Sequence, residues 1–236
     1  MNPATASLER GLDVLVTLGM PEHANGLGVV ALTELVGGDK SQLSRTLAAL
    51  ESRGFVVRDP ETRGYRLGFR LFALAGSVAE SRVLAAAPPI LRGLVRELGE
   101  SAHLSVRQGD QVLTLLSEAP AATLHAPGRV GALTPVASTS AGRALVLDLT
   151  DEELGALGLE AHAAAIAEAR RRGYALVREE FEPGLVAAAA PVRDAAGQIV
   201  AAVNVSAPTF RFDDRLEAAA ESVVEAANEL AALATR

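Results

Sequence analysis

Apolar residues recur at helical spacing in the first fifty positions of the chain. The pattern predicts helices over residues 7–18, 29–36 and 40–53. The first helix has apolar residues at Leu8, Leu12, Leu15 and Val16. The stripe of the third helix that is expected to face inward is Leu43, Leu47 and Leu50. Three short helices of this kind predict a small helical unit at the N-terminus.

The junctions of these helices carry turn and capping signals. Gly37 suits a left-handed turn, and Asp39 is placed to cap the third helix, with Gln42 completing a capping-box-like pair. Two short runs then flank an Asp-Pro turn, at 55–58 and 65–67, and predict a β-hairpin. Helix, short helix, tight turn, helix and hairpin together predict a winged helix-turn-helix. The alternative is a small helical domain with an incidental hairpin.

The rest of the chain mixes helices with apolar runs typical of antiparallel strands. A helical segment over 69–81 leads to Pro88 and Pro89, which we expect to break the helix and start a new one. Further helices are predicted at 90–98, 140–149 and 162–172, and a last helix is predicted to begin after a cap at Asp213 or Asp214. Strands are predicted at 102–106, 112–116, 185–192 and 199–206. The predicted fold class is α+β, in three parts: a winged helix-turn-helix over 1–68, a linker helix over 69–87 and an α+β domain over 88–236.

Composition narrows the functional classes. The 236 residues include no Cys, which excludes disulfides, Cys-based metal sites and thiol nucleophiles. No run of about 18 apolar residues is present, and the first residues lack the basic and apolar regions of a signal peptide. We therefore expect a cytoplasmic protein without a membrane partner.

Charge is distributed unevenly along the chain. Residues 1–82 carry 9 Lys+Arg and 9 Asp+Glu, so the net charge of −7 belongs to the remainder. Within 40–70, seven basic residues stand against three acidic ones. Local positive charge of this kind is what contact with DNA phosphates requires, although a solvated protein face would look similar.

Polar side chains favour the DNA interpretation. The face of the third helix opposite its leucines carries short polar residues and one Arg, which suits base edges in a major groove. The candidate DNA-binding residues are Lys40, Ser41, Gln42, Ser44, Arg45 and Thr46 on this helix and Arg58, Arg63 and Arg66 on the hairpin.

Several runs resemble the IclR family of bacterial transcription regulators. They include Ser7–Leu15, Leu32–Gly37, Lys40–Leu47, Leu50–Val56 and Tyr65–Gly68, and in the C-terminal part Arg172–Tyr174, Glu179–Gly184, Ala190–Asp194 and Val203–Pro208. The resemblance implies a GAF-like effector-binding domain and subunits paired through the N-terminal domain and linker helix. A homodimer or homotetramer on double-stranded operator DNA is the expected assembly.

A hydroxyl-rich passage over 134–143 is the candidate effector site. A helix that starts there would present free backbone N–H groups to a carboxylate. The alternative interpretation is that the serines are ordinary N-caps. Resemblance to the family implies a small organic acid effector contacting Thr134, Ser140, Ala141, Val177, Ala187, Asn204 and Ser206. Asn204 and Ser206 share one strand face. Relatives that bind glyoxylate tend to have an acidic residue and a Cys where this chain has Val177 and Ala187. That difference favours an aromatic or longer acid.

Other readings of the sequence are weaker. A G-x-G-x-x-A run at 26–31 does not follow a strand, and the four histidines (His23, His103, His125 and His162) lack metal-ligand spacing. No catalytic constellation is evident, so we expect neither an enzyme nor a cofactor. A small-molecule enzyme and a protein-interaction adaptor remain the alternatives to a ligand-controlled regulator. Arg178 either pairs with the effector or points to water; the effector's identity, the operator and the sign of regulation stay open.

Overall fold

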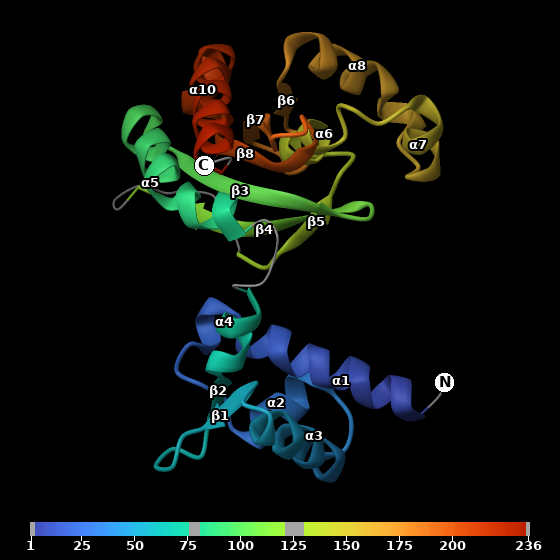
Figure 1. The fold of residues 1–236 in the computed structure, drawn as a ribbon, viewed down its shortest axis with the longest axis vertical. Coiled ribbons are helices and arrows are strands. Elements are labelled where there is room, and N and C mark those ends of the chain that lie inside the picture. The colour runs from blue at the N-terminus through green and yellow to red at the C-terminus, as the bar shows by residue number, and fades with distance from the viewer. Residues whose placement is uncertain (1–2, 76–80, 121–129, 235–236) are drawn as a thin grey trace. The chain divides into compact units, whose positions relative to one another are not determined.

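The computed structural model describes residues 3–75, 81–120 and 130–234, and the chain divides into two compact units, Met1–Ser81 and Arg82–Arg236 (Figure 1). Each unit has its own hydrophobic core. Residues 76–80 of the predicted linker helix (69–87) and His125 lie outside the described residues. Residues 82–87, which the sequence assigns to the linker, fall in the second unit.

The N-terminal unit is a winged helix-turn-helix, as predicted. Its elements are α1 (Pro3–Leu18), a 3-10 turn (Pro21–His23), α2 (Val29–Val36), α3 (Lys40–Ser52), β1 (Val56–Arg58), β2 (Tyr65–Leu67) and α4 (Phe69–Ala75). β1 and β2 pair antiparallel to form the wing, and an isolated bridge joins Leu27 to Tyr65 beside it. The core consists of Val14, Leu18, Leu32, Leu43, Leu47, Val56 and Tyr65.

The apolar residues of α1 do not all face the core. The structure buries Val14 and Leu18, while Leu8, Leu12 and Val16 are exposed. α1 carries two apolar stripes, and only one of them can face so small a core. Periodicity alone does not distinguish the two stripes, so the exposed one requires another explanation.

The turn before α3 forms as predicted, but the capping box does not. Gly37 and Gly38 both have positive φ, and the Asp39 carboxylate accepts hydrogen bonds from the backbone N–H groups of Ser41 and Gln42. The Gln42 side chain does not reach back to Asp39. Its Oε1 instead accepts a hydrogen bond from Arg10 Nη1 at 2.9 Å, because α1 packs beside α3 and offers a charged donor.

The C-terminal unit has the predicted α+β class and is built on one antiparallel sheet in the order β5-β4-β3-β8-β7-β6. The strands are β3 (Ser101–Gln108), β4 (Gln111–Glu118), β5 (Leu133–Pro135), β6 (Ala175–Arg178), β7 (Leu185–Arg193) and β8 (Ile199–Pro208). The helices are α5 (Ser81–Leu98), α6 (Ser140–Leu145), α7 (Asp151–Ala156), α8 (Ala163–Arg172), α9 (Thr209–Phe212) and α10 (Leu216–Ala234), with 3-10 turns at Glu160–His162 and Asp213–Arg215.

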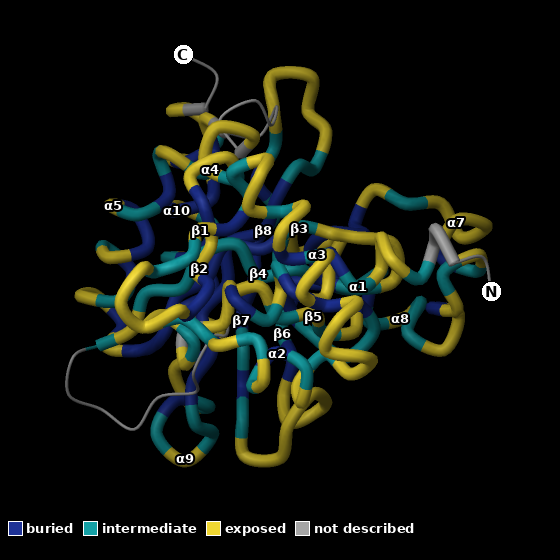
Figure 2. The backbone as a smooth tube through the Cα atoms, turned by 90° about the horizontal axis from the view of Figure 1, so that it is seen from below, coloured by how far each residue is buried: buried dark blue, intermediate teal, exposed yellow. Residues whose placement is uncertain are grey.

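The sheet has two differently covered faces. One face, with Leu104, Val203 and Val205, packs under α5 and α10 in the larger core. The central strands are accordingly drawn mostly as buried in Figure 2. The second face packs against α6 and α8 at one end, around Ala189 and Ala202. Strand alternation places polar residues on the remainder of this second face.

The predicted helix break at Pro88 and Pro89 is wrong, because α5 runs through both residues. A proline inside a helix costs about 3 kcal/mol or more, through a lost hydrogen bond and a steric clash. Ala87, Leu91 and the other buried residues of α5 continue along one face past the prolines. Each buried leucine contributes about 1.5–3 kcal/mol, so packing on the sheet outweighs the break.

Other element boundaries differ from the prediction. α6 ends at Leu145 rather than at 149, and α8 begins at Ala163 after a 3-10 turn. Asp213 and Asp214 lie in a second 3-10 turn and not at a cap of α10; the Asp213 carboxylate binds Arg178 instead. In the part of the chain that the structure describes, no helix is both long and apolar enough to cross a membrane.

Candidate functional site

The outer face of α3 presents the predicted polar residues to solvent. Lys40, Ser41, Gln42, Ser44 and Arg45 are exposed, and Thr46 is half-buried. Three of them are engaged within the unit: Ser41 contacts Asp39, Gln42 contacts Arg10, and the Thr46 hydroxyl donates to the Gln42 carbonyl oxygen. Within the described chain, Lys40, Ser44 and Arg45 form no hydrogen bond or ion pair through their side chains. Their side chains are therefore available for contacts outside the protein.

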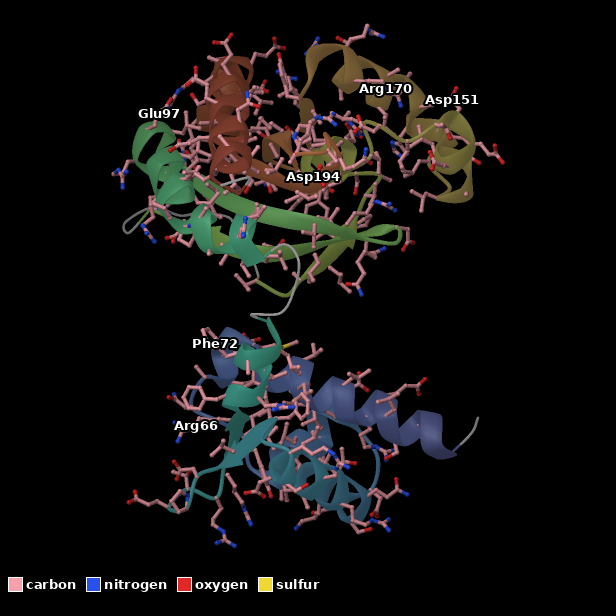
Figure 3. The ribbon with its side chains drawn as sticks, in the orientation of Figure 1. Arg66, Phe72, Glu97, Asp151, Arg170 and Asp194 are labelled. Carbon is pink, nitrogen blue, oxygen red and sulfur yellow. The ribbon has the colours of Figure 1, made fainter. Side chains whose placement is uncertain are left out.

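The wing holds its three arginines in different states. Arg66 lies on β2 (Figure 3). Its guanidinium forms an ion pair with Asp59. The Arg58 guanidinium lies 5.3 Å from the centre of the Tyr65 ring. Arg63 stands at the turn with a φ of 61°, and its exposed side chain has no ion pair among the described residues. The Asp59 carboxylate accepts hydrogen bonds from the backbone N–H groups of Thr62 and Glu61, and these bonds shape the turn. The bonds also lower the pKa of Asp59, and the one from Thr62 has the largest effect.

A cavity of about 490 Å³ opens over the second face of the C-terminal sheet. All seven predicted effector residues line it: Thr134, Ser140, Ala141, Val177, Ala187, Asn204 and Ser206. The structure thus brings together residues that lie up to 72 positions apart in the sequence. Cavities of this size are typical of small-molecule sites.

Strand register explains how four of these residues meet. Val177 on β6 pairs with Ala187 on β7, and Ala187 pairs with Ser206 on β8. Asn204, two residues earlier on β8, therefore faces the same side as Ser206. These pairs place two hydrogen-bonding side chains beside two small apolar ones.

The start of α6 forms another wall. The Thr139 hydroxyl accepts a hydrogen bond from Gly142 N at 3.1 Å, so the cap is the threonine and not Ser138 or Ser140. A Cβ at Gly142 would lie 2.2 Å from the Val136 carbonyl oxygen, so only glycine allows this approach. Ser140 is buried and lines the cavity, and its hydroxyl has no hydrogen bond to a described residue.

His103 is a cavity residue that the sequence does not reveal. It lies on β3, paired with Asn204, and is only 5% exposed. Nδ1 is 3.0 Å from Ser117 Oγ, and Nε2 is 3.0 Å from Ser206 Oγ. Burial lowers the pKa of His103 to about 4, so the imidazole is neutral at neutral pH.

The loop between β6 and β7 lines part of the cavity and is held by an ion pair with α6. It contributes Phe181 and Glu182 to the lining. The Arg143 side chain on α6, only 5% exposed, makes a two-pronged contact with the Glu180 carboxylate of this loop, with Nη1 to Oε1 at 2.8 Å. Arg143 also approaches the Leu176 carbonyl oxygen at 3.5 Å. The buried guanidinium thus holds the loop in place.

Arg178 does not line the cavity. Its Nε donates to Asp213 Oδ1 at 2.7 Å, and its Nη2 lies 3.7 Å from Glu217. Neither prediction for Arg178 is therefore complete: it pairs with a carboxylate, but with one of this chain. The described residues contain no group of three or more His, Asp or Glu that could hold a metal ion.

Further lining residues come from β3, β4 and β5, which are consecutive strands of the sheet. Ser105 and Thr114 join through the β3–β4 register, and Val112 and Leu133 come from β4 and β5. Alternation along 101–108 would place His103 and Ser105 on one face, but only the β3–β8 register shows that this face is the one with Asn204 and Ser206.

Two family profiles match the chain. The profile described as "IclR helix-turn-helix domain" matches residues 7–60, and "Bacterial transcriptional regulator IclR C-terminal" matches residues 75–232. Both families consist of regulators of transcription rather than enzymes.

Individual relatives agree with this assignment. The chain is 32% identical to the HTH-type transcriptional regulator BhcR of Paracoccus denitrificans, over 95% of this chain and 85% of that protein. It is also 32% identical to the transcriptional repressor IclR of Escherichia coli, over 97% and 90% of the two chains. The fold matches the crystal structure of an IclR regulator from Alicyclobacillus acidocaldarius with a TM-score of 0.79 at 24% identity, covering 97% and 98% of the two chains.

A second solved structure is similar in fold and carries a ligand. It is an IclR homologue from Microbacterium hydrocarbonoxydans in complex with 4-hydroxybenzoate, with a TM-score of 0.78 at 23% identity over 97% and 98% of the chains. The helix-turn-helix domain, the C-terminal α+β domain and these matches over nearly the whole sequence lead to one assignment. The chain belongs to the IclR family of bacterial transcriptional regulators.

Proposed function

We propose that this regulator binds double-stranded operator DNA through α3 and the wing, and that a small organic acid bound in the C-terminal cavity controls its affinity. The observation that carries the proposal is the meeting of the seven expected effector residues around one cavity. Such a regulator acts on DNA in the bacterial cytoplasm and requires no metal or cofactor for binding.

The DNA-reading role is supported by side chains that have no hydrogen bond or ion pair to the described residues. Arg45 and Lys40 on α3 are exposed and unpaired within the described chain, which suits contact with bases and phosphates. Arg63 at the tip of the wing suits a phosphate. Arg66 would first have to leave Asp59, so we assign it a smaller share of the binding energy.

The chemistry of the cavity favours an aromatic acid. Val112, Val177 and Leu185 provide apolar surface, and Phe181 at the rim provides an aromatic ring. Ser140, Asn204 and Ser206 provide polar groups for one end of a ligand. The fold relative that binds 4-hydroxybenzoate supports the same class of ligand.

Exposed apolar residues of the N-terminal unit support a dimer. Leu8, Leu12 and Val16 form an exposed stripe on α1, and Phe69 and Phe72 on α4 are 89% and 82% exposed. Apolar surface of this extent commonly marks a protein interface. Pairing of two subunits would place two copies of α3 on a near-palindromic operator.

A thermal-shift screen tests the effector assignment. Small carboxylates and aromatic acids, including 4-hydroxybenzoate, are added to the full chain, and a bound acid raises the unfolding temperature by mass action. Gel shifts with the promoter DNA adjacent to the gene test the DNA assignment. If no acid in the panel stabilises the protein, the proposed effector class is wrong; if the protein shifts no promoter DNA, the regulator assignment of this chain fails.

A further inference from the structure

No cationic side chain lines the effector cavity in the part of the chain that the structure describes. Glu182, on the exposed loop, supplies a carboxylate. The other polar lining groups are uncharged: the hydroxyls of Ser105, Thr114, Thr134, Thr139, Ser140 and Ser206, the amide of Asn204 and the imidazole of His103. An acid that enters this cavity therefore meets no fixed positive charge on its walls.

Arg143 and Arg178 already form ion pairs within the C-terminal unit. The guanidinium of Arg143 is held by Glu180 beneath the loop, and that of Arg178 is held by Asp213. Neither residue lines the cavity. A carboxylate taken out of water needs a paired charge or a proton, because hydroxyl and amide groups compensate only part of its lost hydration.

His103 is the one basic titratable group among the described lining residues. Its ring is fixed between two hydroxyls, with Nδ1 at 3.0 Å from Ser117 Oγ on β4 and Nε2 at 3.0 Å from Ser206 Oγ on β8. Ser206 and His103 both border the cavity, so a carboxylate hydrogen-bonded to Ser206 would lie within a few ångströms of the imidazole.

We infer that at mildly acidic pH His103 takes up a proton when the acid binds, so that the bound state is an imidazolium–carboxylate pair in a cavity whose described lining has no other cationic side chain. The inference rests on the proposed function, because it concerns the same site and the same ligand class. The proton comes from solvent, and no bond of the effector is made or broken. His103 is thereby the residue that selects acids over their neutral amides.

His103 is neutral in the ligand-free cavity and can therefore accept a proton. Burial keeps His103 neutral at pH 7, and a carboxylate within about 4–6 Å raises the pKa of a histidine by roughly 1–3 units. Ser117 from β4 and Ser206 from β8 contact the ring, Asn204 is the strand partner of His103 on β8, and Glu182 from the loop lines the same cavity. Glu182 is the titratable one, and its exposure weakens its influence.

Calorimetry of the full chain with 4-hydroxybenzoate tests the inference. Titrations in buffers of different ionisation enthalpy measure the protons bound with the ligand. We expect uptake of more than about half a proton at pH 5.5 and about tenfold tighter binding at pH 5 than at pH 7. His103→Gln should bind the acid more weakly, with no uptake, while His23→Gln, in the N-terminal unit, should behave as the wild type.

Each other outcome overturns the inference in a distinguishable way. Binding without proton uptake leaves the proposed function intact and excludes His103 as the charge partner. Uptake that persists in His103→Gln places the proton on another group, either the acid itself or Glu182, and excludes His103 as its site. Absence of binding by 4-hydroxybenzoate and by every other acid of the panel overturns this inference together with the acid assignment.

A spectroscopic measurement on the wild type guards against misfolding of the variant. In protein labelled with ¹⁵N-histidine, saturating 4-hydroxybenzoate at pH 5.5 should convert one imidazole from the neutral to the protonated pattern of nitrogen shifts. Unchanged imidazole signals in the saturated complex would contradict the inference even if His103→Gln failed to fold.

Discussion

Arg45 and Arg63 occupy different positions in the proposed DNA complex, and their removal should have different effects. Arg45→Ala should cost about 1–3 kcal/mol in operator binding, because a base contact is lost, and should affect unrelated DNA much less. Arg63→Ala should weaken binding to all DNA about equally, because a phosphate contact is lost. Fluorescence anisotropy with operator and unrelated duplexes at a fixed salt concentration measures both.

Arg66→Ala provides the matched control on the wing. Because Arg66 already pairs with Asp59, its loss should weaken binding less than the loss of Arg63. Equal losses for Arg45→Ala on operator and unrelated DNA would show that this arginine does not read a base.

His103 should also make the stability of the ligand-free protein depend on pH. The folded pKa of about 4 lies below the ordinary value of 6.5, so the unfolded chain binds the proton more readily. The stabilising contribution is complete above about pH 6.5 and is lost as the pH falls toward 4, a difference of roughly 3 kcal/mol. Urea unfolding between pH 7 and 5 should show about 2 kcal/mol of this loss in the wild type and a flatter profile in His103→Gln. Parallel profiles would contradict the buried neutral state.

At the scale of elements, an ion pair between Arg143 and Glu180 connects α6 to the β6–β7 loop, so one substitution can break this connection. Glu180→Gln leaves the Arg143 guanidinium buried without a counter-charge and should destabilise the C-terminal unit by about 3 kcal/mol. The double variant Arg143→Met, Glu180→Gln removes the buried charge as well and should recover most of that loss. Urea unfolding at pH 7 compares them; a double variant no more stable than Glu180→Gln would argue against the buried pair.

The elements also show what sequence patterns can and cannot predict. α2 (Val29–Val36) and the hairpin strands β7 and β8 agree closely with prediction, because their periodicity, turns and caps are local signals. α5 does not, since its passage through Pro88 and Pro89 depends on packing against a sheet formed by distant residues. The inward face of α1 could not be predicted for a related reason: the helix has two apolar stripes, and only tertiary contacts determine which one is buried.

The candidate site follows the same division. The roles of Asn204 and Ser206 were predicted from strand alternation and resemblance to the family, and the structure places both at the cavity. His103 was not predicted, because its place beside Ser206 depends on the pairing of β3 with β8, about 100 residues away. Whether these residues bind an effector stays a prediction.

At the scale of the whole molecule, the exposed aromatic residues of α4 should hold the dimer together. Phe72→Ser removes apolar surface from each subunit and should weaken association by about 2–4 kcal/mol per dimer, or roughly 30-fold or more. Because the side chain is exposed within its own unit, the fold should be little affected. Sedimentation velocity over a range of concentrations measures the change, with Phe210→Ser, an 80% exposed phenylalanine of the C-terminal unit, as control. Identical sedimentation of Phe72→Ser and wild type would exclude this interface.

The central claim is that a small acid in the C-terminal cavity changes the affinity of the N-terminal unit for DNA. Coupling free energies between such sites are typically 1–3 kcal/mol, which correspond to about 5–150-fold in affinity. The direct measurement is the anisotropy of labelled promoter DNA titrated with the full chain, with and without the acid that stabilises it most. We predict a change in Kd of at least about fivefold, which Ala187→Trp, by filling the cavity, should abolish. A Kd that is unchanged by saturating acid would contradict the account.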